Sequence, residues 1–288
     1  MSIYISNDLY LQDIDVNDLR RNRPLVGYKS VLGPSDISPS PENPDSPGSN
    51  AWSPDTYTNW QSLSDPDFPL DQEVDLINAG SDPIDYIAIA GHNFGTSGAT
   101  YSIESASDGL NFDTVVVAPK IVGSDASIIE YFDESQHAKF RIVFVIPAAK
   151  FVKISHIKMG QITRLQRPRF GGVKPPLNNR VQGFSNTSVI GNYLGNKITA
   201  EGGPPWEITQ QWNTQEFVRD TVKPFIDHMN NINTDTGNGP TGSFFYAHAP
   251  DDYPAEVQYC WKEPGQDVTP ENQGSKWMQW QCSGDSLK

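Results

Sequence analysis

The chain has 288 residues, a formal net charge of −14, 19% charged residues, 23 glycines and 23 prolines. A charge this negative argues against specific nucleic-acid binding, because neutralising phosphates needs clustered Lys and Arg, and it disfavours docking on anionic lipid. The many turn-forming residues favour short strands over long helices, and the length suggests two domains, with one large β-domain as the alternative.

Residues 1–50 are expected to form an N-terminal segment and a linker. The first 19 residues have neither a basic nor an apolar region, which predicts no signal peptide. No stretch of about 18 apolar residues occurs anywhere, so no membrane span is expected. Residues 34–50, "PSDISPSPENPDSPGSN", are rich in Pro, Ser and Asp, which predicts an exposed loop or linker.

Residues 51–165 carry the signals of a β-sandwich, because several short strands are separated by turn residues. The stretch "PIDYIAIAG" is apolar on both faces, which indicates a central strand. The stretch "ATYSIES" alternates, with Tyr101 and Ile103 on one face. It leads into "SDG", where Gly109 is expected to supply the positive φ of a hairpin turn.

Residues 166–288 are expected to form a second β-rich domain with one amphipathic helix. A stretch rich in Pro, Gly and Arg precedes it, and residues 168–183 predict an extended arm. Asn213 and Glu216 have the spacing of a capping pair, and Pro224 must kink the helix or start its second half. The expected apolar face comprises Val218, Val222, Phe225, Ile226 and Met229.

No catalytic, cofactor or metal motif is present, so the chain is not expected to be an enzyme. The corner "GHNFGTSG", residues 91–98, has two interpretations: a bend between strands, which we favour, or a ligand site using His92, Asn93 and Phe94. Trp277 and Trp280 lie three residues apart in an extended segment, which predicts one buried and one available ring.

The two cysteines, Cys260 and Cys282, lie late in the chain and fit no metal-binding spacing. Two free buried thiols are favoured over a disulfide, although the two residues can also sit on neighbouring strands.

Residues 51–160 resemble the discoidin-like, galactose-binding jelly roll. The resemblance lies in Trp52, the "VDL" strand at residues 74–76, "IDYIAIAGHNFG", and the turn of "YSIESASDGLNF" with Phe112 in the aromatic position. It implies a jelly-roll sandwich whose variable loops bind sugars, lipids or proteins. No set of sugar-binding residues matches the family.

The stretches "PIDYIAIAGHNFG" and "FFYAHAPDDYPAEVQYCW", the latter at residues 244–261, resemble minor tail and distal-tail (baseplate) proteins of siphophages. That resemblance implies a ring, hexameric or trimeric, that joins the tail tube to the hub or fibres. Here the jelly roll precedes the second β-domain, which departs from the usual order. Residues 1–35 would then complete the ring domain, with the jelly roll as an insertion.

The sequence thus predicts a mainly β protein: a discoidin-like jelly roll followed by a second β-rich domain with one amphipathic helix. Its expected function is structural, in a phage tail tip assembled in the bacterial host cytoplasm, without cofactor. The expected partners are copies of itself, other tail proteins and a host surface glycan. The alternatives are a receptor- or carbohydrate-binding tail adhesin and a glycan-degrading tail enzyme.

Overall fold

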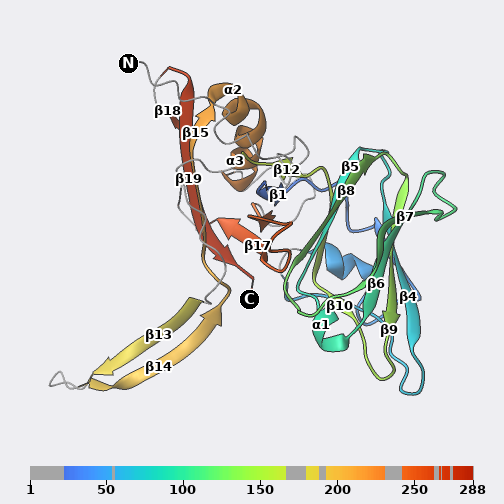
Figure 1. Ribbon diagram of the computed structural model, residues 1–288. Coiled ribbons are helices and arrows are strands. Elements are labelled where there is room, and N and C mark those ends of the chain that lie inside the picture. Colours follow the sequence, from blue (N-terminus) through green and yellow to red (C-terminus); the bar gives the residue numbers. More distant parts are fainter. Residues whose placement is uncertain are drawn as a thin grey trace.

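The computed structural model describes residues 23–53, 56–166, 180–187, 193–230, 242–262, 266, 268–272 and 275–287. These residues form several antiparallel sheets and one long helical segment over residues 215–230 (Figure 1). The expected mainly β class is therefore confirmed.

The first region is a two-sheet sandwich with a jelly-roll strand order. Its larger sheet has the order β2 (Ile37–Ser40), β4 (Leu70–Ile77), β9 (Lys139–Ile146), β6 (Thr100–Ala106) and β7 (Thr114–Ile121). The facing sheet has the order β11 (His156–Gly160), β5 (Ile84–Ala90) and β8 (Ile128–Ser135). Short elements close its ends: η3 (Gly48–Trp52), α1 (Phe94–Ser97), and the pair β3 (Trp60–Gln61) and β10 (Lys153–Ile154).

Alternation along β9 shows why this segment is a strand of a sandwich. Phe140, Ile142 and Phe144 are fully buried in the core between the two sheets, together with Ile146. The residues between them point away from that core, and Val145 is 47% exposed. The period of two gives β9 one apolar face, which is typical of a sandwich strand. Its pairing with β4 on one side and β6 on the other places it at the centre of the larger sheet.

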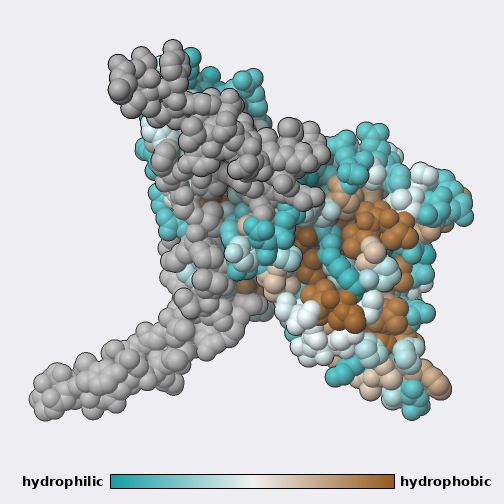
Figure 2. Space-filling view, in the orientation of Figure 1, coloured by the Kyte–Doolittle hydropathy of each residue, from teal (hydrophilic) through white to brown (hydrophobic). Residues whose placement is uncertain are grey.

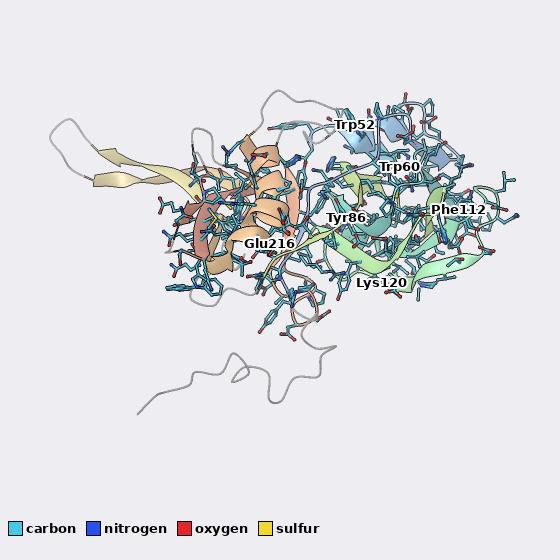
Figure 3. The ribbon with its side chains drawn as sticks, turned by 90° about the horizontal axis from the view of Figure 1, so that it is seen from above. Trp52, Trp60, Tyr86, Phe112, Lys120 and Glu216 are labelled. Atoms are coloured by element: carbon cyan, nitrogen blue, oxygen red, sulfur yellow. The ribbon has the colours of Figure 1, made fainter. Side chains whose placement is uncertain are left out.

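Strand β5 is buried on both faces, as its continuous apolar sequence predicts. Ile87 and Ile89 pack into the sandwich core. Tyr86, Ala88 and Ala90 pack on the other side, in a cluster shared with a second sheet. The hydroxyl of Tyr86 donates a hydrogen bond to the carbonyl of Lys29. Tyr86 therefore lies between the two regions of the protein (Figure 3).

The second region is a seven-stranded sheet. Its order is β12 (Thr163–Arg164), β1 (Leu25–Gly27), β16 (Phe244–Ala247), β17 (Val257–Lys262), β19 (Trp277–Ser286) and β15 (Trp206–Thr214), with β18 (Glu271–Asn272) beside β19. The segment "SKWMQWQC" thus contributes to a central strand, paired on both sides. The free, buried Cys260 and Cys282 lie on β17 and β19, as favoured from the sequence.

One helical segment covers a face of this second sheet. It consists of α2 (Gln215–Phe217), the π-helical turn η4 (Val218–Val222) and α3 (Lys223–Asn230). The predicted apolar face is confirmed, because Val218, Val222, Phe225, Ile226 and Met229 are all buried. Pro224 starts the second half: it lies in the first turn of α3, directly after the π-helical turn η4, where the regular i→i−4 hydrogen-bond ladder is already interrupted.

The capping pair expected at Asn213 and Glu216 is wrong by one residue. The cap is Thr214, whose hydroxyl accepts a hydrogen bond from the N–H of Phe217 at 3.2 Å. Asn213 is still paired with Met278 in the sheet and is buried. Because the strand continues this far, the helix begins one residue later than the spacing suggests.

Both ends of the sandwich segment enter the second sheet. Strand β1 pairs with β12 on one side and with β16 on the other. Residues 34–50 also differ from the expected linker, because β2 pairs with β4 as an edge strand and Ile37 is buried. Only alternate residues of β2 face the core, so a Pro- and Ser-rich sequence is compatible with this edge position.

Strands β13 (Arg180–Thr187) and β14 (Tyr193–Gly202) form an antiparallel ribbon. Figure 1 shows this ribbon extending away from both regions. Among the described residues, its two strands pair only with each other. The remainder of the expected arm, residues 168–179, lies outside the described residues. No helix in the described part of the chain is long and apolar enough to cross a membrane.

Candidate functional site

The corner at residues 91–98 is a tightly held bend. Gly91 has φ +62° and Gly98 has φ +68°, values that favour glycine. A Cβ on Gly91 would lie 2.7 Å from the Ser155 side chain. Between the two glycines the chain forms the single turn α1. The two glycines therefore allow the chain to reverse direction between β5 and β6.

His92 is engaged within the protein. Its side chain is buried, with Nε2 lying 2.6 Å from the carbonyl oxygen of Ala126. Nδ1 accepts a hydrogen bond from the N–H of Phe94, and the imidazole stacks on the Phe94 ring at 4.1 Å. Burial lowers the pKa of His92 to about 4, so the ring is neutral near pH 7. The imidazole therefore stabilises the corner through its contacts within the protein.

Asn93 and Phe94 hold neighbouring segments in place. The amide of Asn93 donates to the carbonyl of Phe151 at 2.9 Å and accepts from the N–H of Lys153 at 2.8 Å. Phe94 is fully buried in the sandwich core. Asn93 therefore connects the corner to the segment after β9 by hydrogen bonds, and Phe94 fixes the corner to the sandwich core by packing.

Three loops meet at this end of the sandwich. The loop of residues 62–69 pairs with the loop of residues 147–152 through Ser62 N–H to Val152 O at 2.8 Å and Ala149 N–H to Asp65 O at 2.7 Å. Exposed apolar side chains stand on these two loops: Leu63, Phe68 and Phe151. Together with Asn93 they form what we call the loop-end surface.

The backbone beneath the two phenylalanines is fixed. The carboxylate of Asp65 accepts hydrogen bonds from the N–H groups of Asp67 and Phe68 at 2.8 and 3.1 Å. Phe68 is nevertheless 68% exposed. Phe151 is 39% exposed, although Asn93 holds its carbonyl. Exposed aromatic rings on a pre-organised backbone are suited to binding, because little chain entropy is lost when a ligand stacks on them.

Phe68 and Phe151 were not among the residues predicted from the sequence. One signal was present for Phe68, which stands alone among turn formers in "SDPDFPL". An isolated aromatic residue in such a loop has no strand face on which to be buried. Figure 2 shows hydrophobic residues on the surface of the sandwich in that view, and Val115, Ile121 and Val145 are also exposed, so exposed apolar side chains are not confined to these loops.

Trp277 and Trp280 lie on β19 and differ in environment. Trp280 is buried in the core of the second region and lies edge-on to Phe225, with ring centroids 6.4 Å apart. Trp277 is half-buried at the end of the strand, where it pairs with Thr214. The structure does not bring either tryptophan to the corner at residues 91–98, which belongs to the other region.

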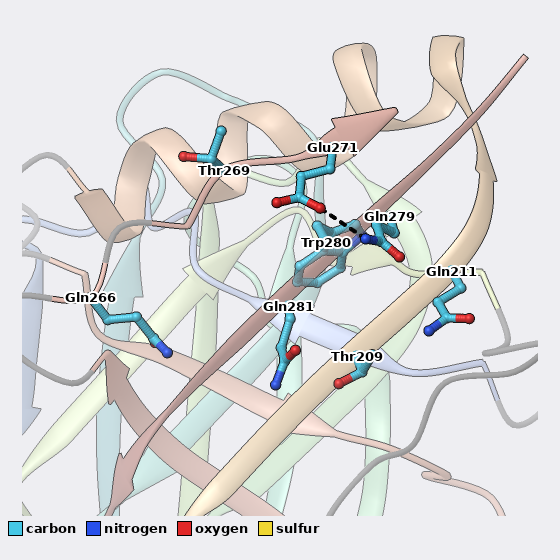
Figure 4. A pocket seen from close by; sticks show the side chains of 8 residues that line it. All are labelled: Thr209, Gln211, Gln266, Thr269, Glu271, Gln279, Trp280 and Gln281. Atoms are coloured by element: carbon cyan, nitrogen blue, oxygen red, sulfur yellow. Dashed lines mark hydrogen bonds between the residues drawn. The ribbon is translucent and has the colours of Figure 1, made fainter. Parts of the chain in front are cut away.

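A groove of about 440 Å³ lies on the face of the β15, β19 and β18 strands (Figure 4). The residues that line it are mostly amides and hydroxyls: Thr209, Gln211, Gln266, Thr269, Glu271, Gln279, Trp280 and Gln281. The Gln279 amide donates to the Glu271 carboxylate at 2.9 Å. This groove was not predicted from the sequence, since its residues come from three separate segments.

One buried acid connects the two sheets of the sandwich. Glu130 on β8 accepts hydrogen bonds from the Tyr101 hydroxyl and from the Lys120 ammonium, at 2.7 Å for the latter. Burial and the neighbouring Glu130 raise the pKa of Tyr101. Each polar group of this triad has a partner, and Lys120 reaches the buried Glu130 from an exposed position on β7. In the described residues, no three His, Cys, Asp or Glu side chains are grouped to hold a metal ion.

The sandwich is similar to solved carbohydrate-binding modules. One is CpGH89CBM32-5 from Clostridium perfringens, solved with GalNAc-β-1,3-galactose: identity is 15%, coverage is 46% of this chain and 100% of that chain, and the TM-score is 0.40. Another is the family 32 module of C. perfringens NanJ, solved with galactose: identity is 18%, coverage is 45% and 97%, and the TM-score is 0.37.

A third is a chitosan-binding module from Paenibacillus sp. IK-5: identity is 14%, coverage is 50% and 98%, and the TM-score is 0.36. No protein-family model matches the sequence, and no curated protein matches it. Similarity at this level assigns no ligand, and the sandwich is defined here by its own strand order.

Proposed function

We propose that this chain is a non-catalytic carbohydrate-binding protein, of the receptor-binding adhesin class, and that the loop-end surface holds the ligand. The observation that carries the proposal is the exposure of Phe68 and Phe151 on loops whose backbones are fixed by Asp65 and Asn93. Aromatic rings stack on the C–H faces of sugars, while neighbouring polar groups bind the hydroxyls.

Polar groups are available beside the rings. Asp67, Lys150 and Lys153 are exposed on the same loops or directly after them. Hydroxyl groups of a sugar both donate and accept, so carboxylates and ammonium groups at the rim can each bind them. This combination of rigid apolar centre and charged rim fits a glycan better than a lipid or a nucleic acid, given the net charge of −14.

The test is binding of the purified full chain to an array of bacterial surface glycans. The variants Phe68→Ala and Phe151→Ala are each expected to weaken binding about tenfold or more, since an aromatic anchor contributes about 1–2 kcal/mol. Leu110→Ala is the matched control, because Leu110 is 79% exposed on the β6–β7 turn. The proposal is contradicted if the chain binds no glycan on the array, or if all three variants lose the same amount of binding affinity.

A second candidate function is assembly into a phage tail tip, as a subunit that contacts copies of itself and other tail proteins. The ribbon β13–β14 favours it. A two-stranded ribbon standing alone is only marginally stable in water, so a surface on another molecule is expected to support it. Ring formation with threefold or sixfold symmetry would supply such a surface.

Light scattering and negative-stain images of the purified chain test this second function. A closed ring of several copies is expected, and replacement of residues 181–201 by a short Gly-Ser link is expected to abolish it. The shortened chain should keep its circular dichroism spectrum, because no described strand outside the ribbon pairs with β13 or β14. Rings of unchanged mass in the shortened chain would count against the ribbon as the assembly contact.

A further inference from the structure

The groove on the β15–β19 face is separate from the loop-end surface. It lies in the second region, where Thr209 and Gln211 from β15 and Gln279 and Gln281 from β19 form part of its lining (Figure 4). Gln266, Thr269 and Glu271 complete the lining. Its volume of about 440 Å³ falls in the range of small-molecule sites, roughly 300–1,000 Å³.

The hydrogen-bonding capacity of the groove is partly used and partly open. Gln266 is fixed by two hydrogen bonds to Ser283, and Gln281 donates to Glu207 at 2.9 Å. These bonds hold the lining amides in position. Among the described residues, the side chains of Thr209, Gln211 and Thr269 make no hydrogen bond to the protein. Fixed amides beside open hydroxyl and amide groups make a pre-organised polar site.

Trp280 lies beneath the groove. Its indole is buried in the core of the second region and packs edge-on to Phe225. Along β19 the buried Trp280 alternates with Gln279 and Gln281, so the indole lies on the helix side of the strand and the two glutamines face the groove. The groups that the groove offers to a ligand are therefore amide, hydroxyl and carboxylate groups.

The lining selects one class of ligand. Among the described residues that line the groove there is no Lys, Arg or His, which disfavours phosphates and other anions. Glu271 is the one carboxylate among these described lining residues, too few for a bare metal cation. Apart from Trp280, none of them offers an apolar side chain to a lipid or an aromatic ligand. Four amides and two hydroxyls both donate and accept, as the hydroxyl groups of a polyol do.

We infer that this groove binds a neutral, polyhydroxylated ligand, a saccharide unit, with Gln211, Glu271 and Gln279 as the principal hydrogen-bonding groups. The site is independent of the loop-end surface, and it binds its ligand without catalysing a reaction. A chain with both sites would contact a branched or long glycan at two points, and the second contact would become effectively intramolecular.

The test is protein-observed NMR of side-chain amide signals, with galactose, N-acetylglucosamine and rhamnose as neutral probes and glucuronic acid as the anionic probe. A neutral sugar is expected to shift the groove glutamine signals in a saturable way. Glu271→Gln and Gln211→Ala are expected to weaken that binding about tenfold, the loss typical of one hydrogen bond to a charged or fixed group. Gln136→Ala is the control, since Gln136 is exposed on the sandwich.

Phe151→Ala should leave the groove shifts unchanged, which separates this site from the proposed loop-end site. The inference is overturned if no neutral sugar shifts these signals, if glucuronic acid binds more tightly than the neutral sugars, or if Glu271→Gln and Gln211→Ala bind as the wild type does. Circular dichroism of both variants verifies that they fold.

Discussion

The ammonium nitrogen of Lys158 lies 2.6 Å from the backbone carbonyl oxygen of Ser243, inside the protein. Lys158 is on β11 of the sandwich and Ser243 precedes β16 of the second sheet, so this contact joins the two regions. Tyr28 O is 3.5 Å from the same nitrogen, and His228 Nε2 contacts the same Ser243 carbonyl at 3.0 Å. A fully buried lysine with only carbonyl partners on the described residues is expected to be sensitive to pH.

Stability should rise with pH between about 7 and 9 because of Lys158. Burial lowers its pKa from 10.5 to about 7 in the folded state. The unfolded chain therefore binds more protons in this window, and folding becomes more favourable as pH increases. Urea unfolding at pH 7, 8 and 9 measures the slope. Lys158→Met should flatten it, whereas Lys153→Met, at an exposed site, should leave it intact; an unchanged slope in Lys158→Met contradicts the assignment.

Acidification should destabilise the fold through His92 and His228. Burial lowers the pKa of each to about 4, below the ordinary value of 6.5. Their stabilising contribution is present above pH 6.5 and is lost as pH falls toward 4, by on the order of 1–3 kcal/mol for each. Unfolding curves at pH 7 and 5 test this. His92→Gln should reduce the difference between the two curves, and the double variant with His228→Gln should reduce it further.

Phe94→Ala should destabilise the protein by about 3–5 kcal/mol, because it leaves a cavity in the sandwich core. Phe151→Ala, at a 39% exposed site of the same loop end, should cost about 1 kcal/mol or less. Chemical unfolding monitored by circular dichroism compares the two. Similar losses in both variants would mean that the corner is not anchored as described.

Thr214→Ala should destabilise the protein by about 1 kcal/mol, since the helix loses the hydroxyl that caps Phe217 N–H. Glu216→Ala should change stability by less than about 0.5 kcal/mol, as expected for a surface position. The two substitutions distinguish the observed cap from the one that the Asn213–Glu216 spacing suggests. If Glu216→Ala loses more stability than Thr214→Ala, the cap suggested by the Asn213–Glu216 spacing is favoured and the observed Thr214 cap is contradicted.

Strong periodicity was readable from the sequence. The apolar face of the helix was predictable from its repeat of 3.6 residues. The buried strand "IDYIAIA" was predictable because a mainly apolar run of seven residues between a proline and a glycine is too short for a buried helix. Gly109 was equally predictable and has φ +72°. Strand β2 was not, since Pro and Ser dominate it and only alternate residues such as Ile37 reach the core.

The candidate sites were much harder to predict. His92 and Asn93 have the residue types of a binding site, yet their partners, Ala126, Phe151 and Lys153, are 34–60 residues away in the sequence. Only the fold shows that their polar groups are engaged. The loop-end surface and the groove each combine segments that are distant in sequence, and no local pattern encodes such a combination.

The loop-end surface is best tested by NMR mapping, on the full chain, of the glycan that binds most tightly on the array. We expect saturable shifts in residues 62–69, 91–95 and 147–153, and their loss in Phe68→Ala and Phe151→Ala. Saturable binding that leaves these three loops unperturbed would contradict the loop-end surface as the ligand site.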